Sequence, residues 1–431
     1  MAVRAAHRLV ARLRDFARDR AANISTLFAF TALPVVVMLG GTTDYILVVD
    51  ARTKLNAAAD AAALAAVGKN AMSLSTDSAT SLADKIFVAQ LTGSDTAGYV
   101  TMKKPTVSDA SGARSSTYAY TADVPTSFLG IFGLSKFTVS GSVTASAALP
   151  VYMDFYLLLD NTPSMGVAAT TAGINTMVAN TPDQCAFACH DTSTYPNDYY
   201  GLAKRLGVTT RIDVMRTATQ QLMDTASTTQ AVSNQFRMAI YTYGASAQSR
   251  SLTTISSLTS NLSSAKNAAG NIDLMTVPYQ NYNNDMDSDH DGILAGVNSA
   301  ISNPGSGTTS SSPQKVLFFV SDGVADANYS ASNCSRPLYG GYRCQEPLNV
   351  AKCTAIKNRG IKIAVLYTTY LPLPTNDWYM SYIAPFSPQI PTNMQACASP
   401  GLYFEVSPSG GIAEAMNALF KKAVQGARLT S

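Results

Sequence analysis

The second part of the chain, from about residue 151, alternates short apolar runs with longer stretches in which apolar residues recur at helical spacing. Runs of strand length between helical segments predict βα units, and repeated βα units predict a parallel sheet with helices on both faces. The predicted strands are 155–159, 238–243, 316–320, 361–367 and 402–406, and the predicted helices are 212–226, 294–301, 347–358 and 412–424. We therefore expect an α/β domain with a doubly wound parallel sheet, whose ligands bind beyond the carboxyl ends of the strands.

The N-terminal part has a different pattern. Residues 21–43 contain no charged side chain, and such a helix would be about 34 Å long, enough to cross a bilayer. Six arginines precede this window, so the positive-inside rule places the N-terminus in the cytoplasm and the bulk of the chain outside. A cleaved signal peptide is the first alternative, although its apolar region would be shorter. A soluble cytoplasmic protein with a buried apolar helix is the second.

Between the apolar window and the α/β domain lie two further segments. Residues 50–66 are rich in alanine and lack Gly and Pro, which predicts that the membrane helix continues outward. Residues 67–150 are rich in Ser, Thr and Ala and alternate in short pieces such as 137–143, which predicts a small mixed spacer module, partly β. The predicted organisation is a basic tail 1–20, a membrane helix with extension 21–66, the spacer 67–150, and the α/β domain 151–431 with a cysteine-containing insertion around 180–210.

Composition narrows the class of protein. Hydrophobic residues make up 46% of the 431 residues and charged residues only 14%, which excludes charge-driven disorder and a broad basic surface for nucleic acid. A mean hydropathy of +0.06 leaves room for one membrane helix but not for many.

All six cysteines follow the apolar window, and an even number is typical of disulfides in an oxidising compartment. Pairing of nearest neighbours predicts the disulfides Cys185–Cys189, Cys334–Cys344 and Cys353–Cys397. Cys185, Cys189 and His190 also resemble a haem-attachment motif, but that motif has two residues between its cysteines and this one has three. A disulfide in an insertion loop is the preferred interpretation, and haem or zinc is the alternative.

Candidate chemistry lies where two predicted strands end. Asp160, Thr162 and Ser164 follow the first strand, and Asp322 follows the strand 316–320. A carboxylate and two hydroxyls at alternate positions can converge on one hard cation, and Asp322 adds a second carboxylate at the carboxyl end of another strand.

A separate acidic stretch matches part of a calcium loop. Asp287, Asp289, Asp291 and Gly292 occupy positions one, three, five and six of an EF-hand-type loop. Position twelve is Asn298 where the motif has a bidentate Glu. A Ca²⁺ site, a contribution to the neighbouring metal site, and a solvated acidic loop are the three alternatives.

Patterns typical of enzymes are missing from the sequence. It contains no Gly-x-Ser-x-Gly elbow, no phosphate-binding loop with lysine and no His-Glu-x-x-His, and it has only three histidines and three glutamates. We therefore expect a binding protein and not an enzyme.

The residues 160–164 and Asp322 resemble the metal-ion-dependent adhesion site of a von Willebrand factor A domain, whose first motif is Asp-x-Ser-x-Ser. Thr162 replaces one Ser and keeps the hydroxyl. The resemblance implies that Asp160, Thr162, Ser164 and Asp322 hold Mg²⁺ or Mn²⁺, and Ser288 is the candidate for the family's separate Thr ligand. It also implies that a carboxylate from a partner protein completes the metal shell.

Residues 20–30, the Asp44-Tyr45 pair and 51–65 resemble the N-terminal domain of TadE/TadG-type Flp pilus assembly proteins. The stretches 353–367, 397–399 and 427–430 are similar to the A domain of TadG-like proteins. The resemblance implies a single-pass protein of the bacterial inner membrane, periplasmic in its bulk, that binds a pilus assembly or envelope component during assembly of the Flp/Tad (tight adherence) pilus. A metal-dependent surface adhesin or an envelope scaffold unrelated to pili is the alternative. A secreted metal-dependent enzyme and a pseudopilin-like subunit are two further alternatives for the function.

Overall fold

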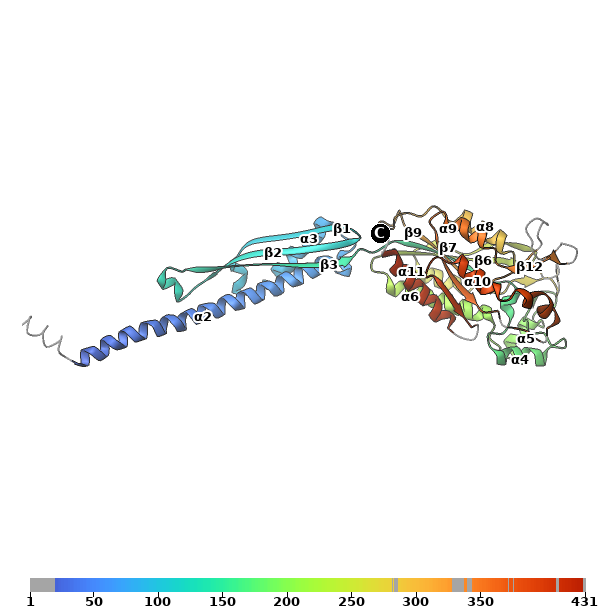
Figure 1. The fold of residues 1–431 in the computed structure, drawn as a ribbon, viewed down its shortest axis with the longest axis horizontal. Helices are drawn as coiled ribbons and strands as arrows, with labels where there is room; N and C mark the ends of the chain where they lie inside the picture. Colours follow the sequence, from blue (N-terminus) through green and yellow to red (C-terminus); the bar gives the residue numbers. More distant parts are fainter. Residues whose placement is uncertain are drawn as a thin grey trace, which may run out of the picture. The chain divides into compact units, whose positions relative to one another are not determined.

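The computed structural model describes residues 20–280, 282, 286–327, 337–338, 343–370, 372–374, 376–407 and 411–428 (Figure 1). Its contacts divide the chain into two compact units, Met1–Ala148 and Leu149–Ser431. Each unit has a hydrophobic core of its own, and each is described by itself. The predicted basic tail falls almost wholly outside the described residues.

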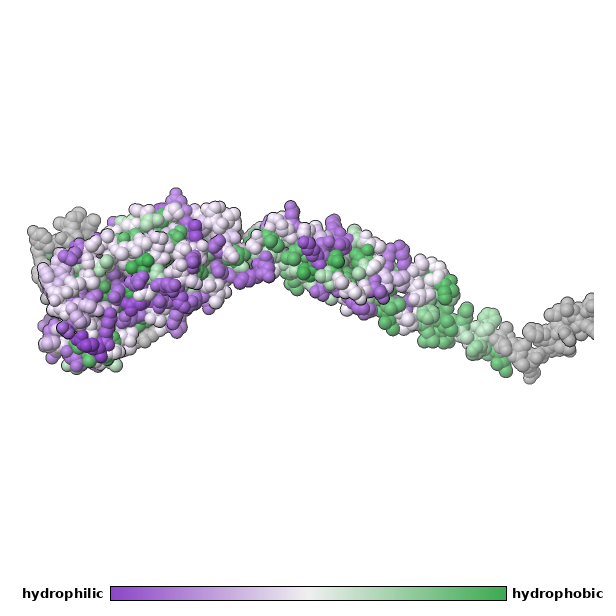
Figure 2. Space-filling model, turned by 180° about the vertical axis from the view of Figure 1, so that it is seen from behind, coloured by the Kyte–Doolittle hydropathy of each residue, from purple (hydrophilic) through white to green (hydrophobic). Residues whose placement is uncertain are grey.

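The first unit is built on one long helix, α2 (Arg20–Val67). The stretch Leu27–Val67 is apolar and long enough to cross a membrane. Its most apolar 18-residue window has a mean hydropathy of 1.8, and only 11% of that window is buried within the molecule. A core helix of a soluble protein would be mostly buried. Figure 2 shows the resulting apolar surface along the N-terminal part of this helix.

The outer part of α2 is the predicted alanine-rich extension, and it packs against the spacer. Leu55 and five alanines from Ala58 to Ala66 recur at spacings of one, three and four residues, so they form one buried face. This face contacts α3 (Thr76–Leu91) and an antiparallel sheet of the strands β1 (Val100–Ala110), β2 (Ala113–Pro125) and β3 (Lys136–Ala148), in the order β1-β2-β3. Strand β2 alternates buried and half-buried residues, and the aromatic rings of Tyr118 and Tyr120 enter the core.

The second unit contains the predicted parallel sheet. Its main strands are β4 (Met153–Leu159), β6 (Phe236–Ser246), β9 (Gln314–Ser321), β13 (Lys362–Thr368) and β14 (Tyr403–Val406), paired in parallel in the order β14-β13-β9-β4-β6. The short strands β8 (Thr276–Val277) and β5 (His190–Asp191) extend the sheet beyond β6. Strands β4 and β9 are almost entirely buried, because helices cover both faces of the sheet.

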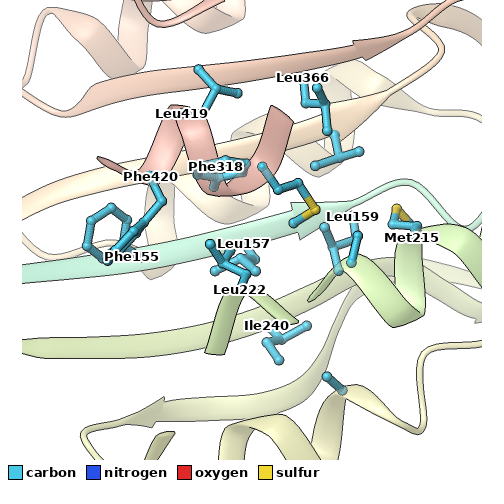
Figure 3. Close-up of a cluster of buried hydrophobic side chains, with 14 of the residues drawn as sticks. Phe155, Leu157, Leu159, Met215, Leu222, Ile240, Phe318, Leu366, Leu419 and Phe420 are labelled. Carbon is cyan, nitrogen blue, oxygen red and sulfur yellow. The ribbon is translucent and has the colours of Figure 1, made fainter. Parts of the chain in front are cut away.

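Two clusters of buried side chains lie on the two opposite faces of the parallel sheet. One packs α6 (Arg211–Thr229), α7 (Leu262–Ala269) and α11 (Ile412–Arg428) on the sheet, where Phe155, Leu157 and Phe318 meet Leu222 and Phe420 (Figure 3). The other packs α8 (His290–Ala300), α9 (Val350–Lys357) and α10 (Gln389–Cys397) on the opposite face. The sheet is therefore doubly wound, as the sequence predicted.

Several elements were not predicted. Strand β7 (Ser249–Thr259) pairs antiparallel with β6 and is only half-buried, so its Ser- and Thr-rich sequence has no apolar run. A second small sheet joins β10 (Val324–Ala327), β12 (Arg343–Pro347) and β11 (Pro337–Leu338). The insertion after β4 forms the helices α4 (Thr171–Asn180) and α5 (Tyr199–Arg205).

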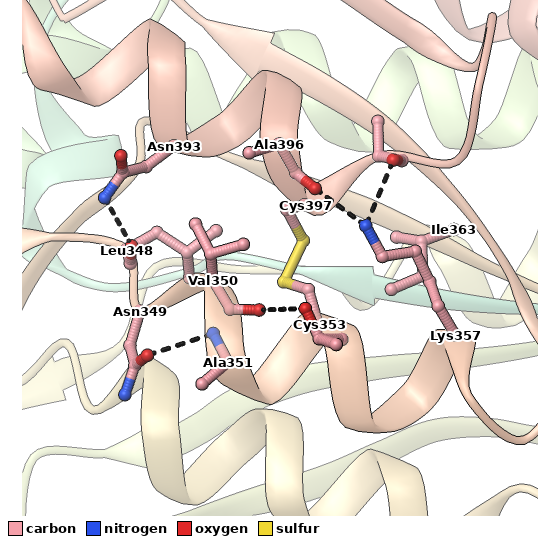
Figure 4. Close-up of a disulfide and its surroundings, with 12 residues drawn as sticks. Leu348, Asn349, Val350, Ala351, Cys353, Lys357, Ile363, Asn393, Ala396 and Cys397 are labelled. Atoms are coloured by element: carbon pink, nitrogen blue, oxygen red, sulfur yellow. Dashed lines mark hydrogen bonds between the residues drawn. A yellow bond between two sulfur atoms is a disulfide. The ribbon is translucent and has the colours of Figure 1, made fainter.

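The disulfide predictions have different outcomes. Cys353 on α9 and Cys397 at the end of α10 form the predicted disulfide, with sulfurs 2.05 Å apart (Figure 4). Cys344 is disulfide-bonded, and its predicted partner Cys334 lies outside the described residues. The predicted Cys185–Cys189 disulfide is not formed, and the Cys185 sulfur accepts a hydrogen bond from the backbone N–H of Phe187 at 3.4 Å.

Candidate functional site

The candidate site begins at the end of β4. Asp160 follows the strand directly, and its side chain is fully buried. One carboxylate oxygen, Oδ1, accepts hydrogen bonds from the backbone N–H of Thr162 at 3.0 Å and from the Thr162 hydroxyl at 2.7 Å. The other, Oδ2, accepts one from the hydroxyl of Ser321 at 2.7 Å. The Thr162 hydroxyl lies 3.3 Å from that of Ser164, so the first motif forms one cluster of oxygens.

Asp322 completes this cluster from the neighbouring strand. Strands β4 and β9 pair in parallel up to Leu159 and Val320, so the residues that follow them lie at the same edge of the sheet. Asp322 is fully buried, and its Oδ2 atom has no hydrogen-bond partner among the described residues. Burial, followed by the charge of Asp160, raises the pKa of Asp322, whereas a hydrogen bond from Ser164 acts in the opposite direction. Burial likewise raises the pKa of Asp160.

A buried arginine, which the sequence analysis did not single out, faces these carboxylates. Arg211 is the first residue of α6, is 1% exposed, and places its Nη1 atom 3.6 Å from Asp322 Oδ2. Its Nε and Nη1 atoms have no hydrogen-bond partner within the described part of the chain. The Arg211 charge partly neutralises the two carboxylates and opposes the rise that burial causes in the pKa of both. The sequence gives one signal only, a helix start at Thr210, whose hydroxyl and N–H donate to Asp213.

His290 is a further buried residue of the site that the sequence did not single out. His290 is fully buried at the start of α8, and its Nε2 atom lies 3.1 Å from the hydroxyl of Ser321, which itself donates to Asp160. Burial lowers the pKa of His290, which favours the neutral ring. Ser288 pairs through its backbone with Asp326, by hydrogen bonds of 2.8 and 3.0 Å, and lines a pocket together with Ser164. The assignment of Ser288 as a metal ligand therefore stays a prediction.

The acidic residues of the predicted calcium loop have separate roles. Asp289 caps α8 by accepting the N–H of Gly292 at 2.9 Å. Asp291 accepts a hydrogen bond from the Asn349 amide at 3.1 Å and lies 3.8 Å from the Lys352 ammonium. Asp287 is buried at 2% exposure. Within the described residues, no three carboxylates, imidazoles or thiols form a group that could hold a metal. The Ca²⁺ site stays a prediction.

A pocket of about 470 Å³ opens beside Ser164. Its lining combines the Cys185 and Cys189 thiols with polar and aromatic side chains from β12 and the segment after β13. One wall is rigidly built: the Arg343 guanidinium forms two hydrogen bonds with the Asp326 carboxylate and lies over the Trp378 ring, 4.5 Å from its centre. The Trp378 indole N–H donates to Gln345 at 3.0 Å. The pocket therefore offers an aromatic surface directly beside the candidate metal ligands.

The oxygen cluster fits a hard divalent cation. Two carboxylates and two hydroxyls are the ligand types that Mg²⁺ and Mn²⁺ prefer, and the buried Asp322 Oδ2 is an acceptor without a donor. Asp160, Thr162, Ser164 and Asp322 would hold the ion. Arg211 lowers the net negative charge that the ion would meet, so it opposes tight binding.

The doubly wound sheet and this acidic edge agree with the resemblance of the second unit to a von Willebrand factor A domain. Residues 22–71 match the family described as "Putative Flp pilus-assembly TadE/G-like". This match agrees with the resemblance seen in the sequence, and it coincides with the apolar helix α2 and its alanine-rich extension.

Three solved structures are similar to this chain at a low level. The von Willebrand factor domain of the type V pili tip protein Mfa5 from Porphyromonas gingivalis has a TM-score of 0.36 and 11% identity, with 65% of this chain and 97% of that chain covered. A mutant of the PilB minor pilin from Streptococcus sanguinis has a TM-score of 0.35 and 10% identity over 76% and 78%. Proximal thread matrix protein 1 from the mussel byssus has a TM-score of 0.36 and 10% identity over 64% and 48%. At this level of similarity these structures say nothing about what the chain binds. Among curated protein sequences, none matches it.

Proposed function

We propose that this protein is a single-pass, inner-membrane component of Flp/Tad pilus assembly whose α/β domain binds a partner protein in the periplasm. The observation that carries the pilus assignment is the TadE/G-like match over residues 22–71. It covers the apolar helix that would form the anchor. The role is one of binding, with no catalytic step.

The charge distribution supports the orientation. The arginines lie before the apolar window, at residues 4, 8, 12, 14, 18 and 20, and favour a cytoplasmic N-terminus. The rest of the chain, with a formed disulfide at Cys353–Cys397, then faces an oxidising compartment. Both features point to the periplasm.

The oxygen cluster supports the mode of binding. When Mg²⁺ or Mn²⁺ is held by Asp160, Thr162, Ser164 and Asp322, it supplies a positive charge that attracts a carboxylate of the partner. Ser164 lies at the boundary between this cluster and the aromatic pocket. A partner segment that combines an acidic with an apolar or aromatic side chain matches both surfaces.

Pilus number tests the function. A strain that lacks the gene is complemented with the wild type, Asp160→Ala or Ser164→Ala, and Ser263→Ala on the exposed surface of α7 is the matched control. We expect loss of pili with the two site variants, at normal protein level, and normal pili with the control. Normal pili in the strain without the gene would overturn the pilus assignment and favour a surface adhesin or an envelope scaffold.

The metal requirement is tested separately by copurification of the partner. We expect EDTA, and Asp160→Ala, to release a partner that stays bound to the Ser263→Ala control. If the partner complex is unchanged by both, the metal-dependent mode is wrong, even where the pilus assignment holds.

A further inference from the structure

The loop between β2 and β3 forms an apolar tip at one end of the spacer sheet. Residues 126–135 contain no charged side chain and include a short 3-10 helix, Leu129–Phe132. The tip is closed on itself, because Thr126 bonds through its N–H to the carbonyl of Ser135 at 3.1 Å and through its hydroxyl to that of Leu134. Four large apolar side chains of the tip are exposed: Phe128 (43%), Ile131 (78%), Phe132 (58%) and Leu134 (45%).

This tip is fixed to α2 by a buried carboxylate. Asp44 is fully buried, and its two oxygens accept hydrogen bonds from the backbone N–H groups of Ser127 at 2.8 Å, Phe128 at 3.0 Å and Leu129 at 2.7 Å. Three charge-assisted hydrogen bonds to one carboxylate hold the start of the 3-10 helix firmly. They also satisfy the carboxylate of Asp44, which is otherwise buried next to the apolar part of α2.

A close backbone approach fixes the tip one turn further toward the N-terminus of α2. A Cβ atom on Gly40 would lie 2.6 Å from the Cβ atom of Phe128, so the contact requires glycine at this position. A Cβ atom on Gly41 would lie 3.7 Å from the Cδ2 atom of Leu129, so this side chain packs on Gly41. Both glycines belong to the uncharged window 21–43, and Gly40 lies about 5 Å inside its outer end.

The charged residues nearest the tip indicate the level of the boundary between membrane and water. Asp44 is the first charged residue of α2 after the uncharged window. The nearest charges on the hairpin are Asp123 and Lys136, which form an exposed ion pair at 2.5 Å where the two strands enter the tip. The tip thus lies on the membrane side of these charges, alongside the last turn of the apolar window.

We propose that the β2–β3 tip inserts its exposed apolar side chains into the periplasmic leaflet of the bilayer, as a second membrane contact beside α2. Lipid is the occupant that fits, because the tip is uncharged, bonds much of its backbone to itself and to Asp44, and lies at the level of an apolar helix segment that is itself exposed. The inference rests on the membrane-spanning role of α2 in the proposed function and goes beyond it. It predicts that α2 and the tip together hold the spacer (67–150) at a fixed distance from the membrane surface.

Tryptophan fluorescence in vesicles tests the insertion. The chain has one tryptophan, Trp378, so Phe132→Trp in a Trp378→Phe background leaves a single reporter at the tip. The matched control is Leu74→Trp, which is 37% exposed and lies near Arg114, about 36 Å along β2 from the tip. The full chain is reconstituted into vesicles of phosphatidylethanolamine and phosphatidylglycerol that carry bromine on the upper part of the acyl chain.

We expect the bromolipid to quench the Phe132→Trp reporter several-fold more strongly than the Leu74→Trp reporter, and aqueous iodide to do the reverse. Quenching of the Phe132→Trp reporter by iodide alone would overturn the proposal. Protection from both quenchers would also overturn it, because a second protein chain would then cover the tip. Alkaline carbonate extraction distinguishes the failure of this proposal from the failure of the proposed function. If the chain stays in the membrane but fails the quenching test, only insertion of the tip is wrong. If the chain is extracted, the membrane-spanning role of α2 is wrong as well.

Discussion

Arg211 changes the chemistry expected of the oxygen cluster, because it brings a positive charge to 3.6 Å from a carboxylate that the metal would also use. Removing one partner of a buried ion pair leaves the other uncompensated, which typically costs about 3–5 kcal/mol of stability. We therefore expect Arg211→Leu to destabilise the metal-free protein and to bind Mn²⁺ more tightly than the wild type, by about tenfold or more.

Melting curves and Mn²⁺ titrations followed by electron paramagnetic resonance, with EDTA-treated protein as the starting state, measure both effects. Asp322→Asn in the Arg211→Leu background is the control and should restore part of the metal-free stability, since one of the two unpaired charges is gone. An Arg211→Leu variant with the stability and Mn²⁺ affinity of the wild type would contradict this role of the arginine.

Arg114 is a second buried arginine, and it stabilises the spacer. It is 3% exposed, donates to the carbonyls of Ala71 at 2.6 Å and Leu74 at 3.0 Å, and forms an ion pair with Asp109 at 2.7 Å. Arg114→Met leaves both carbonyls without this donor, and we expect a loss of about 1–3 kcal/mol in the free energy of unfolding. The exposed pair of Lys103 with Asp84 provides the control, since Lys103→Met should cost less than about 1 kcal/mol. Equal losses in urea unfolding would contradict the prediction.

The same ion pair predicts a dependence on pH. The hydrogen bond from Arg114 holds the pKa of Asp109 below its usual value. A lowered carboxyl pKa in the folded state contributes stability above the ordinary pKa, and this contribution is lost as the pH falls through the folded value. Urea unfolding below about pH 4 should therefore show a smaller loss of stability in Asp109→Asn than in the wild type. A loss as large in the variant would remove Asp109 as a cause.

At the scale of elements, the fit between α2 and the β2–β3 tip depends on the missing side chain of Gly40. Gly40→Val places branched carbon atoms where Phe128 lies, and overpacking of this kind typically costs about 1–3 kcal/mol. We expect the variant to keep α2 in the membrane but to move the tip away, which increases protease cleavage within 126–135. Gly426→Val, on α11 with open space at its Cβ position, is the control. Cleavage that is unchanged by Gly40→Val would show that the tip does not need this contact.

The strands of the α/β domain were predictable because they are buried on both faces, which leaves continuous apolar runs such as 155–159 and 316–320 in the sequence. Strand β7 was not, since a half-buried edge strand needs no such run. In the site, Asp160 and Asp322 follow strands and could be placed together from that fact alone. Arg211 could not, because its burial depends on how α6 closes over the sheet. His290 was missed because the sequence does not show that its ring reaches the hydroxyl of Ser321.

For the whole molecule, separate cores predict separate unfolding. The disulfide Cys353–Cys397 closes a loop with a sequence separation of 44 in the second unit, and its loss should cost that unit about 2–4 kcal/mol. Trp378 also lies in the second unit, so tryptophan fluorescence reports on that unit alone. We expect two transitions in calorimetry, of which dithiothreitol lowers only the one seen by fluorescence. A single transition, lowered as a whole, would contradict the independence of the two units.

Strand β3 also determines how the molecule carries mechanical load. It leaves the tip at Lys136, runs to Ala148, and continues within a few residues into β4 of the α/β domain. Along its whole length it is paired antiparallel with β2, from Pro125 and Lys136 to Ala113 and Ala148. A pull along β3 against an anchored α2 therefore loads its contacts with both β2 and α2. Because the ladder hydrogen bonds lie across that direction, they are loaded all at once in shear and cannot be peeled apart one by one.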